Sequence, residues 1–578
     1  MVDDNVQGAI GTGVMGVMEP AERGAAETIL LGNVLALDSA NTTAEAVAVA
    51  NGRIVATGPR DTVMQLRGKR TEVRDFGART IIPGFNDTHA HSDGLGLKTL
   101  RPSLQDARSI ADVLKKVREL AAQTPAGQWI VTMPIGEPPF YWDAEKALAE
   151  GCFPTRHDLD SAAPDHPVCI ASPSGYWGEP PCTTVLNSLA LKLNGIDRNT
   201  VPRAPGIEIL KDDNGEPNGI IVERNYMRMV EPDLLPAVPR FTLDDRIEGL
   251  RRSLPMYLQK GTTSVYEGHG CSPDVVASYR ELHQRNELTL RSGLCLSPAW
   301  LATSDAEYAM RHWLSWARGS GLGDDMLRIS GIFVGYGGSP QFAEVARKDL
   351  SDTGWSGGIP SINSPADFEA LCMLAGKYGL RLHTLASDKL HEVVPILERV
   401  AEHYPIGERR WVVEHISKSN PRDLGALKAM GVAVTLIPAH YLWKVGHSFS
   451  GLSETELDFL SPAQALVDLG VPVSAATDAV PNDPLFCMWT MLARKDRRSG
   501  KIMGPRGAVS NETALRLLTV NGAWLTFDEH QKGPLLPGYF ADMAVLSGNP
   551  LTASAEGILD INCEATMVGG RWMHGAPH

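Results

Sequence analysis

The sequence lacks the features that mark membrane, nucleic-acid-binding and disulfide-stapled proteins. It has no uninterrupted apolar run of about 18 residues, so we expect no transmembrane helix and no membrane partner. Its net charge of −14 argues against nucleic acid as a partner. The eight cysteines form no CxxC pair, which favours reduced thiols over a disulfide framework. The acidic start lacks the basic segment of a secretory signal, so we expect a cytoplasmic protein.

The composition that is present indicates a large globular chain with a composite domain at its ends. Of the 578 residues, 43% are hydrophobic and 21% charged. Residues 1–25 are rich in Gly, Ala and Met without a period, and we predict a mobile tail there. Short β-rich runs follow Thr28 and return near the C-terminus. We therefore predict that 26–80 and 536–578 together form a β-sandwich domain around 81–535.

Within 81–535, short apolar runs alternate with helical patterns, which indicates parallel βα units. The first candidate strand is Ile81–Phe85. The others lie at 262–266, 290–296, 327–334, 380–383, 411–415, 432–437 and 473–478. About eight strands of this kind close a barrel. The predicted fold class is therefore α/β, a (β/α)8 TIM barrel with the composite domain and an insertion after the first barrel strand.

The insertion is predicted at 101–245, where the alternation stops. The segment is rich in proline and aromatic residues, and we interpret it as a lid over the barrel mouth. A peripheral decoration on the outer helices is the alternative. Its aromatic side chains favour a substrate with an apolar or aromatic group, and Trp142, Tyr176 and Trp177 are candidate substrate-binding residues.

Histidines and an aspartate occur where barrel strands end, the position at which barrels carry their reactive groups. His89 and His91 follow the first strand at i and i+2, so both imidazoles can face one metal ion. His383 ends another candidate strand and is a candidate ligand or a core histidine. His415 could bind metal or polarise a substrate carbonyl. Asp478 follows an apolar run, where a carboxylate is costly unless it binds something, although it could also cap a helix.

These pieces resemble the amidohydrolase superfamily, in the branch of the N-substituted formamide deformylases. The resemblance rests on the ordered motifs Pro83-Gly84-Phe85-Asn86-Asp87-Thr88-His89-Ala90-His91, Leu382-His383, Val413-Glu414-His415 and Thr477-Asp478-Ala479, and it covers the chain from Thr28 to His574. It implies a metal-bearing barrel enzyme that acts on a small-molecule substrate and forms a homo-oligomer.

Many relatives carry a lysine on the fourth strand that bridges two metals, and this chain lacks it. Phe333 stands there and cannot bridge. The site is then mononuclear, with His89, His91, His383 and Asp478 as ligands, or another residue bridges. Glu267 is the favoured bridge, and His269 and Cys295 are alternatives. We expect one Zn²⁺ and leave two open.

The resulting hypothesis is hydrolysis of a C–N bond in an N-substituted amide, formamide or carbamate by metal-activated water. Asp478 would be the general base, and His415 would stabilise the oxyanion if it is not a ligand. His440 and Tyr176, which stands where relatives often have histidine, are candidate substrate contacts. A deaminase, a lactone or ester hydrolase and a non-catalytic scaffold are the alternatives.

Overall fold

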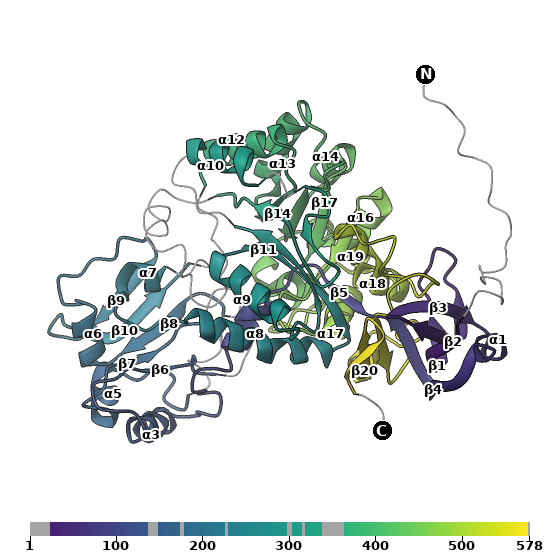
Figure 1. Cartoon of the computed structure of the whole chain (residues 1–578). Coiled ribbons are helices and arrows are strands. Elements are labelled where there is room, and N and C mark those ends of the chain that lie inside the picture. Colours follow the sequence, from purple (N-terminus) through teal and green to yellow (C-terminus); the bar gives the residue numbers. More distant parts are fainter. Residues whose placement is uncertain are drawn as a thin grey trace.

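The computed structural model describes residues 24–136, 148–173, 178–225, 229–297, 303–314, 318–337 and 363–575. The strands of this part form three sheets of seven, five and nine strands. Figure 1 shows the nine-stranded sheet and its helices in the middle, with the five-stranded sheet on one side and the seven-stranded sheet on the other. No helix among these residues is long and apolar enough to cross a membrane.

The central sheet is a nearly closed barrel of eight parallel strands, which confirms the predicted fold class. In sheet order the strands are β18 (Val473–Ala475), β17 (Ala433–Leu436), β16 (Val412–Ile416), β15 (Leu382–Ser387), β14 (Leu327–Phe333), β12 (Arg291–Leu296), β11 (Thr262–Cys271) and β5 (Phe85–Asp87). A ninth strand, β13 (Leu322–Gly323), pairs antiparallel with β14. Residues just after β5 meet β18 and the loop after it: Thr88 Oγ1 lies 2.9 Å from Ser474 Oγ, and the Asp478 amide donates to the His89 carbonyl.

Helices between the strands cover the outside of the barrel. They are α8 (Leu243–Leu258), α9 (Pro273–Gln284), α10 (Thr303–His312), α12 (Pro365–Lys377), α13 (Leu390–Ala401), α14 (Pro421–Met430), α16 (Ala463–Leu469), α17 (Pro484–Ala493), α18 (Asn511–Leu517) and α19 (Val520–Leu525). Side-chain caps start several of them: Ser364 accepts the Asp367 amide, and Asn420 accepts the Asp423 amide. Gly431 ends α14 in the left-handed conformation that favours glycine.

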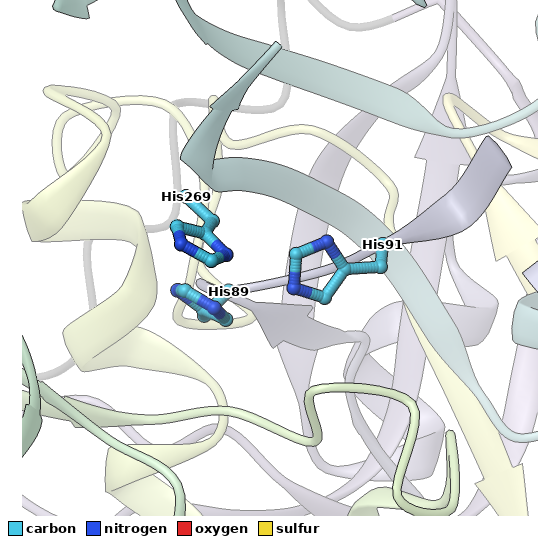
Figure 2. Close-up of side chains that lie close together, drawn as sticks. All are labelled: His89, His91 and His269. Carbon is cyan, nitrogen blue, oxygen red and sulfur yellow. The ribbon is translucent and has the colours of Figure 1, made fainter. Parts of the chain in front are cut away.

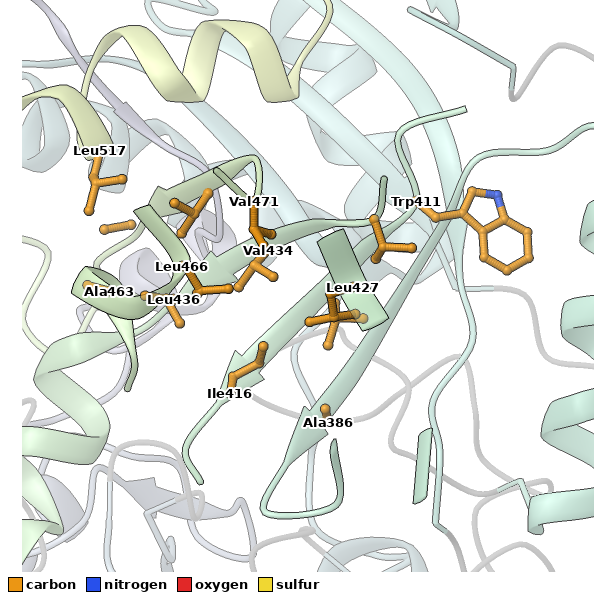
Figure 3. Packing of buried hydrophobic residues seen from close by; sticks show 14 of the residues in the cluster. Ala386, Trp411, Ile416, Leu427, Val434, Leu436, Ala463, Leu466, Val471 and Leu517 are labelled. Carbon is orange, nitrogen blue, oxygen red and sulfur yellow. The ribbon is translucent and has the colours of Figure 1, made fainter. Parts of the chain in front are cut away.

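The largest apolar core lies between the barrel strands and these helices. Figure 3 shows part of this layer, in which Leu427 of α14 and Leu466 of α16 lie with Val434 and Leu436 of β17. All four side chains are fully buried. Burial of one such side chain stabilises the fold by about 1.5–3 kcal/mol, so this layer holds the strand ends in fixed positions.

The first predicted strand, Ile81–Phe85, belongs to two sheets. Ile81 to Pro83 end the long strand β4 (Arg67–Pro83) of the seven-stranded sheet, and β5 begins at Phe85. The break falls at Gly84, where a Cβ would lie 2.2 Å from the Thr263 side chain, so the chain passes close to the neighbouring barrel strand there. The apolar run looks continuous in the sequence because both halves are buried.

The seven-stranded sheet joins the two ends of the chain. Its order is β21 (Arg571–His574), β20 (Cys563–Val568), β19 (Met543–Leu546), β4, β1 (Ala26–Leu35), β2 (Thr43–Ala50) and β3 (Arg53–Gly58). The junction is the antiparallel pairing of β19 with β4, in which Ala544 lies opposite Ile82. Asn51 and Gly52, both at positive φ, make the expected turn between β2 and β3. Of the predicted tail, residues 1–23 lie outside the described part.

The insertion contains the five-stranded sheet, in the order β6 (Ile130–Thr132), β7 (Val168–Ile170), β8 (Cys182–Leu186), β10 (Pro217–Glu223) and β9 (Ile207–Lys211). Met133 and Ala171 from this region pack with Val480 in the loop after β18. Glu179 lies 3.0 Å from His447 of the barrel. These contacts place part of the insertion beside the carboxyl end of the barrel, and its action as a lid stays a prediction.

The remaining short helices decorate the sheets and loops. They are α1 (Arg60–Met64), α2 (Ser92–Leu97), α3 (Ile110–Ala121), α5 (Arg156–Ala162), α6 (Ser188–Leu193), α7 (Val230–Leu234), α15 (Glu454–Asp458), the π-helix η3 (Ala439–Lys444) and the 3₁₀ helices η4 (Gly446–Phe449), η5 (Pro505–Gly507) and η6 (Glu556–Asp560). Of these, α2 directly follows His91 and η3 follows β17.

Candidate metal centre

Four histidines and one aspartate converge at the carboxyl end of the barrel. His89 Nε2 and His415 Nε2 are 2.9 Å apart, and Asp478 Oδ1 lies 3.1 Å from His91 Nε2 and 3.6 Å from His89 Nε2. Within the described residues, two sets could hold a metal ion: His89 with His91 and His269, and His89 with His415 and Asp478. The ligand atoms of each set lie within 4.8 Å of one another. Because the sets share His89, they form one continuous cluster.

The first set brings together His89 and His91, which follow β5, and His269 of β11. Figure 2 shows the His269 ring above that of His89, with His91 beside both. The ring centroids of His269 lie 5.8 Å from His89 and 5.5 Å from His91. The Phe333 ring meets His269 edge to face at 4.9 Å. Phe333, which stands at the position of the expected lysine, therefore packs against the ring of His269.

Hydrogen bonds between two loops hold the ligand positions together. The Asp87 carboxylate at the end of β5 accepts the amide and hydroxyl of Thr477, and the His89 carbonyl accepts the Asp478 amide. His415 and Asp478 both have positive φ, 56° and 55°, which is uncommon for residues other than glycine. Such strain clusters at functional sites, where the surrounding structure fixes it.

Glu414 is an anchor beneath the cluster. Its carboxylate lies 2.9 Å from His89 Nδ1 and 2.6 Å from His383 Nδ1. A carboxylate on Nδ1 fixes the tautomer and leaves Nε2 of His89 facing the cluster. In the sequence, Glu414 stands out only as part of the motif Val413-Glu414-His415, and its place directly before His415 is the signal that could have identified it.

His383 was predicted as a ligand, and the structure places it outside both sets. Its Nε2 lies 3.2 Å from the Tyr266 hydroxyl, and its Nδ1 faces Glu414. The reason is its height in the barrel. The sequence pattern ended the strand at His383, but β15 continues to Ser387, and His383 pairs with Val412, three residues before His415. His383 is therefore below the rim.

Glu267, the favoured bridge, is also outside both sets. Its Oε1 accepts the Ser92 amide at 2.8 Å and the Tyr279 hydroxyl at 2.6 Å, so it anchors the start of α2. Burial raises the pKa of Glu267 to about 7. His269, two residues further along β11, takes the place beside His89. Cys295 lies in an apolar cluster with Tyr266 and Phe333, as a small core residue would.

The protonation states suit a cation at this position. Burial opposes ionisation of Asp478, but His415, His91 and His89 outweigh it and hold its pKa below the usual range. Burial and neighbouring imidazoles lower the pKa of His269 to about 3 and that of His415 well below its ordinary value. Burial opposes ionisation of His89 as well, but Glu414 and Asp478 outweigh it and raise the pKa of His89 to about 9. Neutral imidazoles and an ionised carboxylate are the forms that bind metal, so a cation bound at His89 would displace a proton from it. The residues present therefore fit a divalent ion such as zinc.

Tyr441 and His440 border the cluster from η3. The Tyr441 hydroxyl lies 3.2 Å from His415 Nδ1, which orients that ring, and the His440 ring centroid is 6.1 Å from that of His415. The prediction that His440 contacts substrate is compatible with this buried position beside the cluster. Trp142, Tyr176 and Trp177 lie outside the described residues. Sequence reasoning missed Tyr441, because one tyrosine in a helical turn carries no pattern.

Comparison with known proteins identifies the family. Residues 72–574 match the model of the amidohydrolase family, so the chain belongs to that family. It is 25% identical over 566 residues to the N-substituted formamide deformylase of Arthrobacter pascens, covering 94% of this chain and 97% of that one. It is 24% identical over 541 residues to the amidohydrolase YtcJ of Bacillus subtilis, covering 91% and 95%.

A solved structure shares the architecture. An uncharacterized metal-dependent hydrolase from Pyrococcus horikoshii superposes with a TM-score of 0.65 at 19% identity, covering 92% of this chain and 99% of that one. At this identity the likeness shows the fold. Family, fold and cluster together make this chain a metal-dependent hydrolase of the amidohydrolase family, as the sequence motifs predicted.

Proposed function

We propose that the chain hydrolyses the C–N bond of an N-substituted amide, formamide or carbamate that carries an apolar or aromatic group. The observation that carries this proposal is the convergence of His89, His91, His269, His415 and Asp478 at the carboxyl end of the barrel. The similarity to an N-substituted formamide deformylase supports the choice of bond.

The five residues would hold zinc, the ion that suits an imidazole-rich set with one carboxylate. One ion is proposed, because the two sets share His89. When bound, such an ion lowers the pKa of water and polarises a carbonyl oxygen. Glu414 would keep His89 in the tautomer that presents Nε2, and Phe333 would hold the His269 ring in place.

Asp478 is proposed as the general base. Its carboxylate is fully buried and stays ionised beside the histidines, so it can accept a proton from the attacking water and pass it to the leaving amine. His415, oriented by the Tyr441 hydroxyl, faces the same space and would help to stabilise the negative charge on the carbonyl oxygen.

The test is hydrolysis of a panel of aryl-substituted amides, formamides and carbamates by the purified chain. We expect turnover of at least one class, loss of activity on chelation and recovery on addition of zinc. Asp478→Asn should abolish turnover with the fold intact, whereas Asp106→Asn, an exposed control, should not alter it. Near-normal rates in a folded Asp478→Asn variant would refute the assigned role.

A further inference from the structure

A column of four buried polar side chains runs through the barrel below the metal cluster, and the proposed chemistry uses only its upper end. The column consists of Arg381, Tyr266, His383 and Glu414, and each of these residues is at most 1% exposed. Bulky branched apolar side chains ordinarily fill the interior of such a barrel, and burial of polar groups costs free energy unless they are hydrogen-bonded. A polar column at this position therefore calls for a reason other than packing.

The column is continuous from Arg381 to His89. Arg381, just before β15, donates from Nη1 to the Tyr266 hydroxyl of β11 at 3.3 Å. That hydroxyl lies 3.2 Å from His383 Nε2. His383 Nδ1 is hydrogen-bonded to Glu414 Oε1 at 2.6 Å, and Glu414 Oε2 lies 2.9 Å from His89 Nδ1. A change at the Tyr266 hydroxyl can therefore reach a proposed metal ligand through two intervening side chains.

The donors and acceptors of the column fix the orientation of the His383 ring. The Glu414 carboxylate only accepts, so His383 Nδ1 carries the proton between them. Burial and Arg381 lower the pKa of His383 to about 4, so the ring is neutral and its Nε2 is an acceptor. Arg381 only donates and occupies a lone pair of the Tyr266 oxygen, which leaves the hydroxyl proton for His383 Nε2 and the Ser330 carbonyl. The Tyr266 hydroxyl thus holds the edge of the ring opposite Glu414.

Arg381 is a rigid base for the column. Its Nη2 donates to the Leu525 carbonyl at 2.5 Å, its Nε to the Arg410 carbonyl at 3.3 Å, and its Nη1 also to Ser330 Oγ at 3.2 Å. Leu525 ends α19, Ser330 lies in β14, and Arg410 lies just before β16. The guanidinium is therefore tied to three separate elements of the barrel wall.

Two glycines make room for the column. A Cβ at Gly293 of β12 would lie 2.4 Å from Cδ2 of the Tyr266 ring, and a Cβ at Gly268 of β11 would lie 2.5 Å from Glu414 Oε1. A Cβ this close to another atom forces one of the two groups to move. The backbone of the barrel is thus shaped around the Tyr266 ring and the Glu414 carboxylate.

We propose that Tyr266 and Arg381 are positioning residues of the metal centre, which act through His383 and Glu414 on the orientation of His89. This inference rests on the proposed function and extends its machinery to side chains that touch neither ion nor substrate. A partner that orients a ligating histidine contributes about 10–100-fold to metal affinity. Tyr266 acts one step behind such a partner, so its effect should be smaller and should depend on Glu414.

The experiment measures zinc affinity by competition with a chelator for Tyr266→Phe, Glu414→Gln and the double variant. Phenylalanine keeps the ring that stacks on His383 at 5.0 Å and removes only the hydroxyl. Tyr539→Phe is the matched control, because its hydroxyl also donates to a carbonyl, that of Glu529 at 3.1 Å, beside the core of the seven-stranded sheet. Cobalt bound in place of zinc reports the geometry of the ligands through its visible absorption, independently of activity.

We expect Tyr266→Phe to lower zinc affinity about threefold to tenfold and to shift the cobalt absorption, with both unchanged in the control. In the Glu414→Gln background the same substitution should change zinc affinity by less than about twofold, because the path to His89 is already broken. Arg381→Lys, which keeps the charge but loses the fork of donors, should show the same dependence. Zinc affinity within about twofold of wild type in a folded Tyr266→Phe chain, or an equal loss in both backgrounds, would overturn the positioning role.

The outcome separates the positioning role from the proposed function. A Glu414-dependent effect of Tyr266→Phe in a chain that hydrolyses no amide would leave the positioning role standing and refute the proposed function. Zinc-dependent hydrolysis of amides, with zinc affinity unchanged in Tyr266→Phe, would do the reverse.

Discussion

Glu414→Gln tests how the buried carboxylate beneath the cluster controls metal binding. In the wild-type chain, each oxygen faces an imidazole nitrogen: Oε2 lies 2.9 Å from His89 Nδ1 as an ion pair, and Oε1 is hydrogen-bonded to His383 Nδ1 at 2.6 Å. Glutamine has the same shape but only one acceptor oxygen, so its amide nitrogen must face one of the two N–H groups. One histidine then loses its partner and can turn or change tautomer.

The expected magnitude follows from the position of Glu414 behind His89, a proposed ligand. Replacement of a partner that orients a ligating histidine costs about 10–100-fold in metal affinity. This corresponds to about 1.4–2.7 kcal/mol of binding free energy. The negative charge of Glu414 also attracts the cation, and it raises the pKa of His89 to about 9 against the effect of burial. The loss should therefore fall in the upper part of this range.

The assay is competition between the protein and a chelator of known zinc affinity, for the wild-type chain and the variant. Glu402→Gln, an exposed glutamate on the helix side of the barrel, is the control and should bind zinc as the wild type does. Circular dichroism checks that both variants fold. Zinc affinity within twofold of wild type in a folded Glu414→Gln chain would refute the argument that this carboxylate orients His89.

Three further predictions address the ligand set, the substrate side and the fold. His269→Asn should lower zinc affinity at least tenfold in the chelator assay, and His383→Asn should lower it less; the opposite order would restore the ligand set expected from the sequence. Tyr441→Phe should lower kcat about tenfold with little change in KM, because the hydroxyl orients His415. A tenfold rise in KM with kcat unchanged would instead show that the hydroxyl binds substrate. Asp528→Asn should destabilise the chain by about 3 kcal/mol at pH 7, because the buried carboxylate pairs with Lys532 and Arg328. Burial raises the pKa of Asp528, but Lys532 and Arg328 outweigh burial and lower the pKa below its ordinary value of 3.8. The stability that the ionised carboxylate contributes is therefore fully present above pH 3.8 and is lost as the pH falls further. Urea unfolding at pH 7 and pH 3 should therefore show a smaller gap at the lower pH.

The barrel could be predicted from the sequence because each strand is a short apolar run bounded by helical patterns. The predicted strand at 432–437 and the observed Ala433–Leu436 differ only at their ends. The break at Gly84 could not be predicted, because the runs on both sides are buried and only the approach of Thr263 separates them. Pairing between distant strands, such as β19 with β4, is likewise set by tertiary packing.

The candidate site was predictable where its residues come at the end of a short apolar run in the sequence and less so where the height of the residue in the barrel decides its neighbours. His89, His91, His415 and Asp478 were all proposed from strand-end positions, and the structure brings them together. His383 and Glu267 share similar local patterns but have other partners. His383 lies below the rim beside the Tyr266 hydroxyl, and Glu267 accepts the Ser92 amide at the start of α2. The height of a residue in the barrel depends on register between strands, which a single strand's pattern does not contain.

The central claim is that this cluster is a metal centre required for hydrolysis. It is tested most directly by measuring the metal content of the purified chain by elemental analysis, with hydrolysis assayed on the same samples before and after chelation. The account predicts one zinc ion per chain, with activity that falls in proportion to its removal and returns on addition. A metal-free chain that hydrolyses an amide at the full rate would contradict it.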